Sequence, residues 1–494
     1  MKKNENLVSI FKSNTYTYPD VDTCFCPDEN YPENPFKDRG INSNNKVYKA
    51  VREVLHLLKM DETNYGTENW NPFKDVINLG DTVLIKPNLV MHENMSGEGT
   101  DCLYTQPSVV APVIDYVAIA LKGTGKIIIG DAPMQECDFN KLSNNSGFNN
   151  LLKYYKSKRL NIDMIDFREI RSVVKHGVRI QEKVKDSAGL VIDLCDDSEF
   201  RAIDSEMLKK MRITNYDPGI LNQHHTIGKH EYYITKEVFD ADVIINMPKP
   251  KTHRKGGVTI SLKNLIGVNT RKEFLPHHTV GSKQEGGDEY LRKSIVHKLM
   301  SYLEDEKNIL VANGKINSAR CIAFFSRILG FLLRNTKESY FEGSWYGNNT
   351  ISKTISDINK IVFYSDKYGV MQSEKQRKVF IVADMIVSGE KEGPVLPSSK
   401  NVGIIAAAYN PVIFDEAIAT LMGFDYNKIP AIVTARNVPK PFKLVNHEEA
   451  IIISNDSNIS NITLKDFPES EMLNFVPTTG WQGHIEKHIR VMKE

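Results

Sequence analysis

The sequence predicts an α/β protein whose mainly parallel sheet is flanked by helices and interrupted by α+β insertions. Short apolar runs rich in β-branched residues occur at Thr82–Ile85, Lys126–Ile129 and Ala241–Met247. Runs of this kind are typical of strands that are buried on both faces. Segments with apolar residues at helical spacing lie between them. Strands that alternate with helices need crossover connections, and such connections produce parallel sheets.

The first portion, residues 1–167, supplies strands and helices in alternation. The expected helices are Asn44–Leu58, Thr105–Leu121 and Ser146–Lys158, and a further strand is expected within Asn161–Phe167. Thr105 can cap the second helix, Pro107 suits its first turn, and Gly123 follows its end. The N-terminal leader lacks the apolar region of a signal peptide, so a cytoplasmic protein is expected.

The rest of the chain divides into five further portions. Residues 168–235 have a weaker pattern and are expected to form a partly independent insertion, and residues 236–288 return to the α/β rhythm with a basic loop. Residues 289–353 are expected to be a helical excursion that ends in a loop. Residues 354–440 form a C-terminal α/β portion, in which the strand IIAAA leads into a helix, and residues 441–494 are a polar tail with short strands.

Composition limits the possible partners. The chain of 494 residues has 63 basic and 62 acidic residues, a net charge of +1, which argues against nucleic acid or a membrane surface as the partner. Its six cysteines are scattered without a CxxC pair, so neither a disulfide framework nor an iron–sulfur cluster is expected. Nothing in the composition indicates an oligomeric state.

Polar, proline-containing loops follow four of the apolar strands. These loops are Lys86-Pro87-Asn88, Gly130-Asp131-Ala132-Pro133, Pro248 to His253, and Tyr409-Asn410-Pro411. Ligands of open parallel sheets bind at the carboxyl ends of the strands, where such loops converge. If all four strands are parallel, their polar residues lie at one edge of the sheet and form a ligand site there.

The loop Lys249–Lys263 is strongly basic. No Asp or Glu occurs between Val243 and Lys272, whereas lysines, His253 and Arg254 accumulate there. Two prolines stiffen the loop, and Gly256-Gly257 lets the backbone approach a ligand closely. We interpret the loop as a binding site for a carboxylate or phosphate, in which Lys249 or Lys251 carries protons. The alternative is an ordinary solvated basic loop.

Other candidate residues leave alternatives open. Asp131 can serve as an acid–base group, as a magnesium ligand or as a loop cap. A divalent metal could be held by Asp131 with His253 or His277. His224, His225 and His230 are better explained as surface or capping histidines than as metal ligands. The fingerprints of dinucleotide enzymes, P-loop proteins, zinc proteases and serine hydrolases are absent from the sequence.

Several of these segments together resemble a known family. The matching segments are Lys86-Pro87-Asn88, Tyr104-Thr105-x-Pro107, Gly130-Asp131, Pro248-Lys249-x-Lys251-Thr252-His253, Val258-Thr259, Lys263-Asn264-x-x-Gly267, Gly389-x-x-x-Gly393-Pro394 and Asn410-Pro411-x-x-x-Asp415. In this order the chain resembles the domain of unknown function 362 family from about Val83 to Asp425. The resemblance implies no particular activity. Some members carry a ferredoxin-type cluster segment, which this sequence lacks.

The favoured hypothesis is an enzyme that acts on a small anionic metabolite at the carboxyl edge of the sheet. The catalytic candidates are Lys249, Lys251 and Asp131. The candidate substrate-binding residues are Lys86, Asn88, Thr105, Thr252, His253, Lys263, Asn264 and Asn410. One alternative is a protein that binds an anion without catalysis, and another is a divalent-metal enzyme. The cofactor, the substrate and the reaction are not indicated by the sequence.

Overall fold

A large mixed sheet forms the centre of the protein. The computed structural model describes residues 5–175, 178–184, 189–334, 341–446 and 449–487. The sheet order is β18-β17-β1-β16-β15-β11-β2-β3-β4. From β15 through β11, β2 and β3 to β4, each neighbouring pair is parallel. The predicted parallel arrangement of Thr82–Ile85, Lys126–Ile129 and Val243–Asn246 is therefore confirmed, and with it the α/β fold class.

The strands of this sheet are β1 (Leu7–Lys12), β2 (Thr82–Pro87), β3 (Lys126–Asp131), β4 (Ile162–Asp166), β11 (Val243–Met247), β15 (Lys378–Glu392), β16 (Leu396–Ala408), β17 (Ile451–Ser454) and β18 (Ile462–Thr463), with β12 (Lys251–His253) and β13 (Gly257–Thr259) added beside β15. The helices are α1 (Lys46–Leu57), α2 (Pro107–Leu121), α3 (Phe139–Ser146), α4 (Phe148–Ser157), α5 (Ser205–Lys209), α6 (Pro218–His224), α7 (Lys236–Asp240), α8 (Ser261–Asn264), α9 (Ile295–Ala312), α10 (Ile316–Arg334), α11 (Thr350–Tyr364), α12 (Pro411–Met422) and α13 (Pro430–Arg436).

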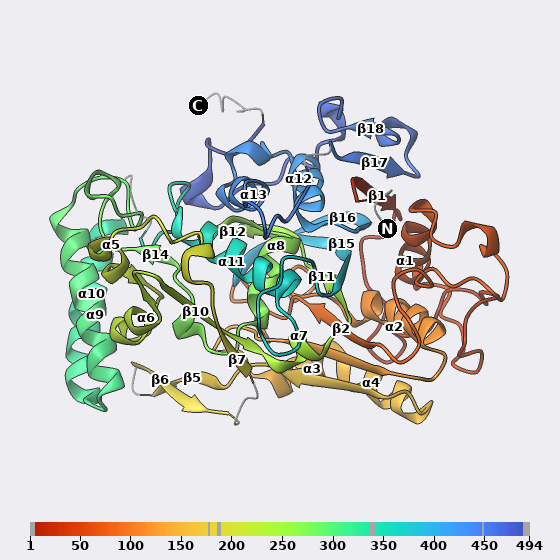
Figure 1. Ribbon diagram of the computed structural model, residues 1–494, viewed down its shortest axis with the longest axis horizontal. Coiled ribbons are helices and arrows are strands. Elements are labelled where there is room, and N and C mark those ends of the chain that lie inside the picture. Colours follow the sequence, from red (N-terminus) through yellow and green to blue (C-terminus); the bar gives the residue numbers. More distant parts are fainter. Residues whose placement is uncertain (1–4, 176–177, 185–188, 335–340, 447–448, 488–494) are drawn as a thin grey trace.

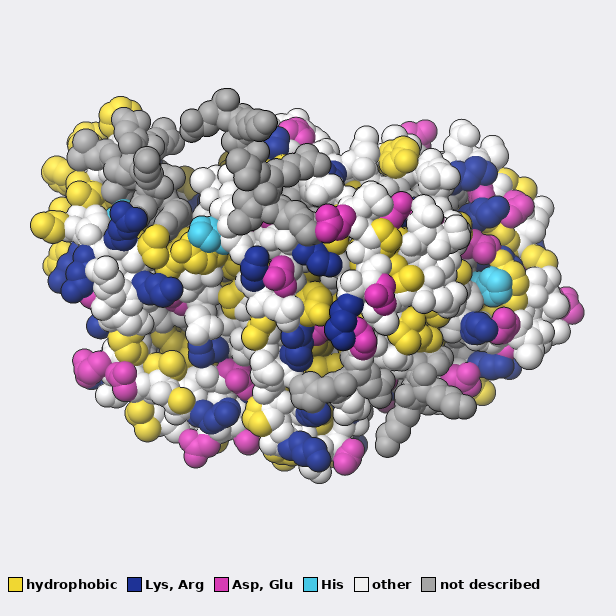
Figure 2. All heavy atoms as spheres, turned by 90° about the horizontal axis from the view of Figure 1, so that it is seen from above, with side chains coloured by type: hydrophobic (Ala, Val, Ile, Leu, Met, Phe, Trp, Pro, Cys, Tyr) yellow, Lys and Arg dark blue, Asp and Glu magenta, His cyan; other side chains and the backbone are white. Residues whose placement is uncertain are grey.

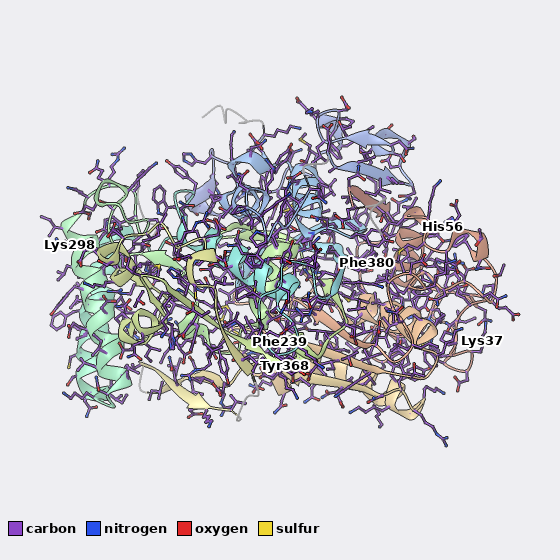
Figure 3. The ribbon with its side chains drawn as sticks, in the orientation of Figure 1. Lys37, His56, Phe239, Lys298, Tyr368 and Phe380 are labelled. Carbon is purple, nitrogen blue, oxygen red and sulfur yellow. The ribbon has the colours of Figure 1, made fainter. Side chains whose placement is uncertain are left out.

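Both faces of the sheet are covered by helices. Along β2, Val83 and Ile85 pack into the core shared with α1, α2 and α4, whereas Leu84 packs into the core shared with α11, α12 and α13. This alternation follows from the two-residue period of a strand. Because both faces are buried, the strands are continuous apolar runs, as the sequence indicated. In Figure 3, Phe380 on β15 lies in the middle of the molecule, whereas Lys298 on α9 and Lys37 lie at opposite ends.

Strand β1 was not predicted, although it lies inside the sheet between β16 and β17. Val8 and Ile10 are fully buried, and the hydroxyl of Ser9 donates to the carbonyl of Val54 at 2.9 Å. The segment is short and is surrounded by Asn, Lys and Ser, so its pattern does not stand out from a polar leader. Strand β17, from the predicted polar tail, pairs with β1 and so also joins the main sheet.

Strand β16 runs antiparallel to β15, which differs from the expected arrangement. Asn246 pairs with Ile381 of β15, and Ile381 pairs with Ala408 at the end of β16. The chain then continues toward the amino ends of the parallel strands. The loop that holds Asn410 therefore leaves the sheet away from the edge where the other three polar loops converge.

The predicted insertion, residues 168–235, forms small antiparallel sheets from β5 (Ile170–Lys175), β6 (Val178–Lys183), β7 (Gly189–Asp193), β8 (Met211–Arg212), β9 (His225–Thr226) and β10 (Lys229–Thr235). It is tied to the main body, because β8 pairs with β14 (His278–Thr279). The predicted helical excursion is the α9–α10 hairpin, which lies at one end of the long axis in Figure 1. Residues 335–340 of its predicted loop and residues 488–494 of the predicted tail lie outside the described residues.

The surface carries charges of both signs. On the face seen in Figure 2, Lys and Arg side chains are interspersed with Asp and Glu side chains and do not gather into one patch. Among the helices of the described ranges, none combines the length and apolarity needed to cross a bilayer.

Candidate functional site

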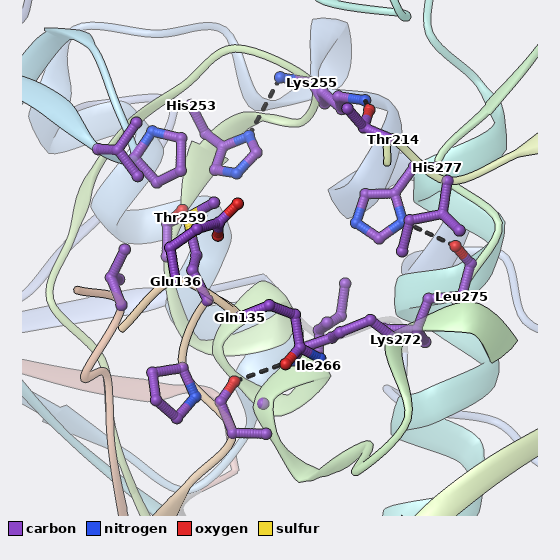
Figure 4. Close-up of a pocket in the computed structure, with 18 of the residues that line it drawn as sticks. Gln135, Glu136, Thr214, His253, Lys255, Thr259, Ile266, Lys272, Leu275 and His277 are labelled. Carbon is purple, nitrogen blue, oxygen red and sulfur yellow. Dashed lines mark hydrogen bonds between the residues drawn. The ribbon is translucent and has the colours of Figure 1, made fainter. Parts of the chain in front are cut away.

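A cavity of about 480 Å³ opens at the carboxyl ends of β2, β3 and β11 (Figure 4). Asn88 reaches it from the loop after β2, Asp131 from the end of β3, and His253 and Lys263 from the segment after β11. The three parallel strands thus bring their loops to one place, as the rule for open sheets requires. The opposite wall comes from residues 213–216 of the insertion and from the segment that contains His277.

Asp131 lines the cavity and forms a buried ion pair with Lys86, which lies behind it. The ammonium group of Lys86 lies 2.8 Å from Oδ1 of Asp131, and Lys86 is fully buried. Oδ2 of Asp131 accepts a hydrogen bond from the backbone N–H of Leu89 at 2.7 Å. Burial lowers the pKa of Lys86, and the charge of Asp131 opposes that effect. Asp131 is therefore a counter-ion of Lys86, and its predicted catalytic role stays a prediction.

Two asparagines extend this network. Oδ1 of Asn264 accepts from Lys86 Nζ at 3.2 Å and from Asn88 Nδ2 at 3.0 Å. A Cβ atom on Gly267 would lie 1.9 Å from Oδ1 of Asp131 and 2.9 Å from Lys86 Nζ. The Lys263-Asn264-x-x-Gly267 segment thus has a structural basis, since Asn264 orders the network and only glycine leaves room for the ion pair.

Lys249, Lys251, Thr252 and Thr105 are part of the framework, and none of them lines the cavity. The ammonium group of Lys249 lies 3.0 Å from Asp384, and that of Lys251 donates to the carbonyl of Leu103. Thr252 donates to the carbonyl of Lys391 at 2.8 Å, and Thr105 donates to that of Met247 at 2.8 Å. Within the predicted loop, Lys251–His253 form β12, which pairs with β13 and β15, and the side chains of Lys251 and Thr252 are fully buried.

The C-terminal segment fixes the remainder of the basic loop. Nε1–H of Trp481, which is fully buried, donates to the carbonyl of Arg254 at 2.6 Å. Gly257 has φ of +75° and a Cβ atom there would lie 2.9 Å from the indole ring. Asp415 accepts from the N–H groups of Ser261 at 2.8 Å and Leu262 at 3.2 Å, at the start of α8. The loop is therefore a packed element and not a solvated one.

Three lysines that face the cavity have no carboxylate partner among the described residues. Lys255 donates to the hydroxyl of Thr214 at 2.8 Å and Lys272 to the carbonyl of Ala132 at 2.9 Å, whereas Lys263 makes no hydrogen bond within the described ranges. Burial and the neighbouring ammonium groups lower the pKa of Lys263 to about 7. Burial lowers the pKa values of Lys255 and Lys272 to about 8.

The acidic groups of the lining (Asp131, Glu136 and Glu342) offset this charge only in part. The charge of Glu342 raises the pKa of Lys255 and that of Asp131 raises the pKa of Lys272, but burial outweighs both. Asp131 pairs with Lys86, and Glu136 pairs with Arg179 at 2.9 Å. Cationic groups in a partly desolvated wall are costly unless an anion compensates them. The lysine cluster (Lys255, Lys263 and Lys272) therefore leaves an excess of positive charge at the cavity.

Two histidines line the cavity, and in each of them Nδ1 contacts the backbone. Nδ1 of His253 accepts from the backbone N–H groups of Lys255 at 3.1 Å and Gly256 at 3.2 Å. Nδ1 of His277 lies 2.7 Å from the carbonyl oxygen of Leu275. Figure 4 shows the second nitrogen of each ring turned toward the interior of the cavity.

Asn410 does not reach the cavity, and its predicted role in substrate binding has no structural support. Its Oδ1 accepts from Val412 N at 2.9 Å and Ile413 N at 3.2 Å, which caps α12, and its Nδ2 donates to the carbonyl of Leu444 at 3.0 Å. The physical reason is the direction of β16, which carries this loop away from the carboxyl edge.

Sequence reasoning did not select Lys255, Lys272 or Thr214 as site residues. Lys255 belonged to the basic run, but nothing in the sequence separated it from Lys249 or Lys251. Lys272 lies at the end of the segment without Asp or Glu, directly before Glu273, so its charge looked compensated in the sequence. Thr214 comes from the insertion, and only the pairing of β8 with β14 brings it to the cavity.

No three His, Cys, Asp or Glu side chains of the described ranges gather in a geometry that could hold a metal ion. His224 pairs with Glu231 at 2.8 Å, and Nε2 of His225 bonds the carbonyl of Phe274 at 2.9 Å. Nδ1 of His225 lies 3.4 Å from Nδ1 of His230. None of these three histidines lines the cavity.

The chain is similar to proteins in three comparisons. A curated thylakoid-associated protein from Synechocystis is 28% identical over 188 residues, which are 38% of this chain and only 39% of that protein. The alignment with the crystal structure of a protein from Thermotoga maritima covers 75% of this chain and 57% of that protein's chain, at 9% identity and a TM-score of 0.30. The family model described as "Domain of unknown function (DUF362)" matches residues 83–196 and 198–420. With more than half of its length matched by that model, the chain belongs to the DUF362 family.

Proposed function

We propose that the protein is an enzyme that acts on a small metabolite bearing a carboxylate or a phosphate, which the lysine cluster holds in the cavity. The observation that carries this proposal is the absence of any carboxylate partner for Lys255, Lys263 and Lys272 in the described part of the chain. A bound anion would compensate the three ammonium groups and raise their lowered pKa values.

The size and polarity of the cavity suit a small polar molecule. A volume of about 480 Å³ falls in the range of small-molecule sites, about 300–1,000 Å³. Oδ1 of Asn88 and Oγ1 of Thr259 are buried in its wall without a hydrogen-bond partner. Leaving such groups unpaired is costly. A ligand hydroxyl that donates to Asn88 would satisfy one of them.

The two alternatives differ from this proposal in what the cavity must contain. A protein that only binds its ligand needs the lysine cluster but not neutral histidines beside it. A divalent-metal enzyme needs carboxylate or imidazole ligands, but Asp131 already pairs with Lys86, and Nδ1 of His253 already accepts two backbone N–H groups. A screen of small acids and phosphate esters by mass spectrometry separates turnover from binding.

Calorimetric titration with sulfate tests the lysine cluster. Lys263→Gln is expected to weaken sulfate binding by about 2–5 kcal/mol, the usual cost of removing one partner of a desolvated charge pair, or at least about 30-fold in Kd. Lys263→Arg should restore only part of the affinity, because a guanidinium is larger and forked. Lys298→Gln, on the exposed face of α9, is the matched control. Equal, small effects of Lys263→Gln and Lys298→Gln would reject the proposal.

Sulfate affinity should also decrease as the pH rises. The pKa of Lys263 is about 7 in the unliganded protein, so its ammonium form is lost above that pH, whereas sulfate stays doubly charged. Binding must then restore a proton, which costs up to about tenfold in affinity per pH unit until the ordinary lysine pKa of about 10.4 is reached. Titrations at pH 6, 7, 8 and 9 measure the effect. A flat profile would show that Lys263 is not the receptor.

A further inference from the structure

The hydrogen bonds of His253 fix its tautomer. Two backbone N–H groups, those of Lys255 and Gly256, donate to Nδ1, at 3.1 and 3.2 Å. Nδ1 must therefore keep its lone pair, and the proton of the neutral ring is on Nε2. Because Nε2 points into the cavity (Figure 4), His253 presents a hydrogen-bond donor there.

His277 has the opposite tautomer. Its Nδ1 lies 2.7 Å from the carbonyl oxygen of Leu275, which can only accept, so Nδ1 carries the proton. Its Nε2 also points into the cavity and presents a lone pair. The cavity thus contains one imidazole donor and one imidazole acceptor, each fixed from behind by the backbone.

Both rings are neutral. Burial lowers the pKa of His277 well below its usual value, and the charges of Lys255 and Lys263 add to that effect. Burial, followed by Lys263 and Arg254, does the same for His253. In the unliganded protein the neutral ring of His277 has a free lone pair, and a bound anion that compensates Lys255 and Lys263 would raise its pKa toward the range in which a general base is effective.

We propose that His277 and His253 form a proton-transfer pair for a small acid or phosphate ester that has a C–H group next to a carbonyl. Nε2 of His277 takes the carbon-bound proton, and Nε2–H of His253 donates to the carbonyl oxygen. This inference rests on the proposed function, because the lysine cluster holds the anionic group of the same ligand.

The step balances without a co-reactant. The C–H bond breaks and its proton forms a new N–H bond at Nε2 of His277. The electron pair of that bond forms a carbon–carbon double bond, and the carbonyl π pair moves to the oxygen. The resulting enolate oxygen accepts the hydrogen bond of His253 and lies in the positive field of the lysine cluster. Return of the proton to the same or a neighbouring atom completes an epimerisation or an isomerisation.

Nitrogen NMR of the full chain labelled with ¹⁵N-histidine tests the two tautomers. The signals are assigned with His253→Gln and His277→Gln, with His278→Gln as a control because His278 is the next residue along and does not line the cavity. We expect a protonated Nε2 in His253 and a protonated Nδ1 in His277, both in neutral rings at pH 7. The same tautomer in both rings, or a charged ring in the unliganded protein, would overturn the proposal.

Deuterium exchange tests the chemistry. The full chain is incubated in D₂O with 2-oxo acids of three to six carbons and with the phosphate esters of small ketones and aldehydes. We expect the wild type and His278→Gln to place deuterium next to the carbonyl of at least one compound. His277→Gln should be slower by about 10²–10⁴-fold, the usual contribution of a general base. No exchange by the wild type with any of these compounds, or undiminished exchange by His277→Gln, would overturn the proposal.

Sulfate binding separates this inference from the proposed function. His277→Gln should bind sulfate within about twofold of the wild type, because its role is in proton transfer, whereas Lys263→Gln should lose at least about 30-fold. An equal loss in both variants would make His277 a binding residue and reject the proton-transfer pair alone. An unchanged affinity in Lys263→Gln would reject the anion site, while the tautomers could still be observed.

Discussion

Asp131→Asn is expected to lower the free energy of unfolding by about 3–5 kcal/mol, since breaking a buried ion pair leaves an uncompensated charge. Lys86 is fully buried, and its ammonium group lies 2.8 Å from Asp131 and 3.2 Å from Asn264 Oδ1. An asparagine keeps an acceptor for the N–H of Leu89 but removes the negative charge. Urea unfolding followed by tryptophan fluorescence measures the change.

The double variant Lys86→Met/Asp131→Asn is the control for this prediction. The double variant removes both charges, so it should be less destabilised than Asp131→Asn alone. Together with the Lys86→Met single variant, the two form a double-mutant cycle that measures the coupling energy between Lys86 and Asp131. If Asp131 were instead a free catalytic acid, Asp131→Asn would keep the stability of the wild type. That result would also remove the explanation for Gly267, whose missing Cβ leaves room for the pair.

The central part of the fold could be predicted because its strands are buried on both faces. Val83, Leu84 and Ile85 pack into opposite cores, and so do Ile127, Ile128 and Ile129, which makes each strand a continuous apolar run. Where three such strands are parallel, their loops must meet at one edge. The same rule correctly predicts that Asn88, Asp131, His253 and Lys263 lie at one cavity.

Strand direction and packing of the loops could not be predicted in the same way. A run such as IIAAA has the same composition whether it is parallel or antiparallel, so the predicted position of Asn410 is wrong. The sequence of the basic loop also does not show which of its lysines face a ligand. Lys249, Lys251, Lys255 and Lys263 are equivalent in sequence, but the pairing of β12 with β13 and β15 buries the first two and leaves the last two facing the cavity. The pairing with β13 is local, but that with β15 joins Lys251 to Gly389, more than a hundred residues along the chain.

The basic loop contains lysines that belong to the framework of the fold and lysines that line the cavity. Lys249 is in the framework and pairs with the carboxylate of Asp384. Lys251 is also in the framework, but it donates to the neutral Leu103 carbonyl, and burial lowers its pKa to about 7. Those in the cavity have only neutral partners or, for Lys263, none in the described ranges. The charge of Lys249 is neutralised within the protein and stabilises the fold, whereas a charge that faces the cavity without an ion-pair partner is available to a ligand.

Lys249→Met separates these two roles. Asp384 would keep the hydrogen bond from the backbone N–H of Gln106 at 2.9 Å and that from Tyr18, but it would lose its cation in a fully buried position. We therefore expect the free energy of unfolding to fall by about 3–5 kcal/mol, measured by urea denaturation. Methionine keeps much of the apolar stem, so the loss reports the charge more than the packing.

Sulfate affinity of the same variant completes the comparison. Lys249 does not line the cavity, so the folded fraction of Lys249→Met should bind sulfate within about twofold of the wild type, whereas Lys263→Gln should lose at least about 30-fold with nearly unchanged stability. The two variants are thus expected to show opposite patterns, although both residues belong to one basic loop. If Lys249→Met kept its stability but lost its sulfate affinity, Lys249 would be a ligand-binding residue. The sulfate site would then lie near Lys249 and not in the cavity.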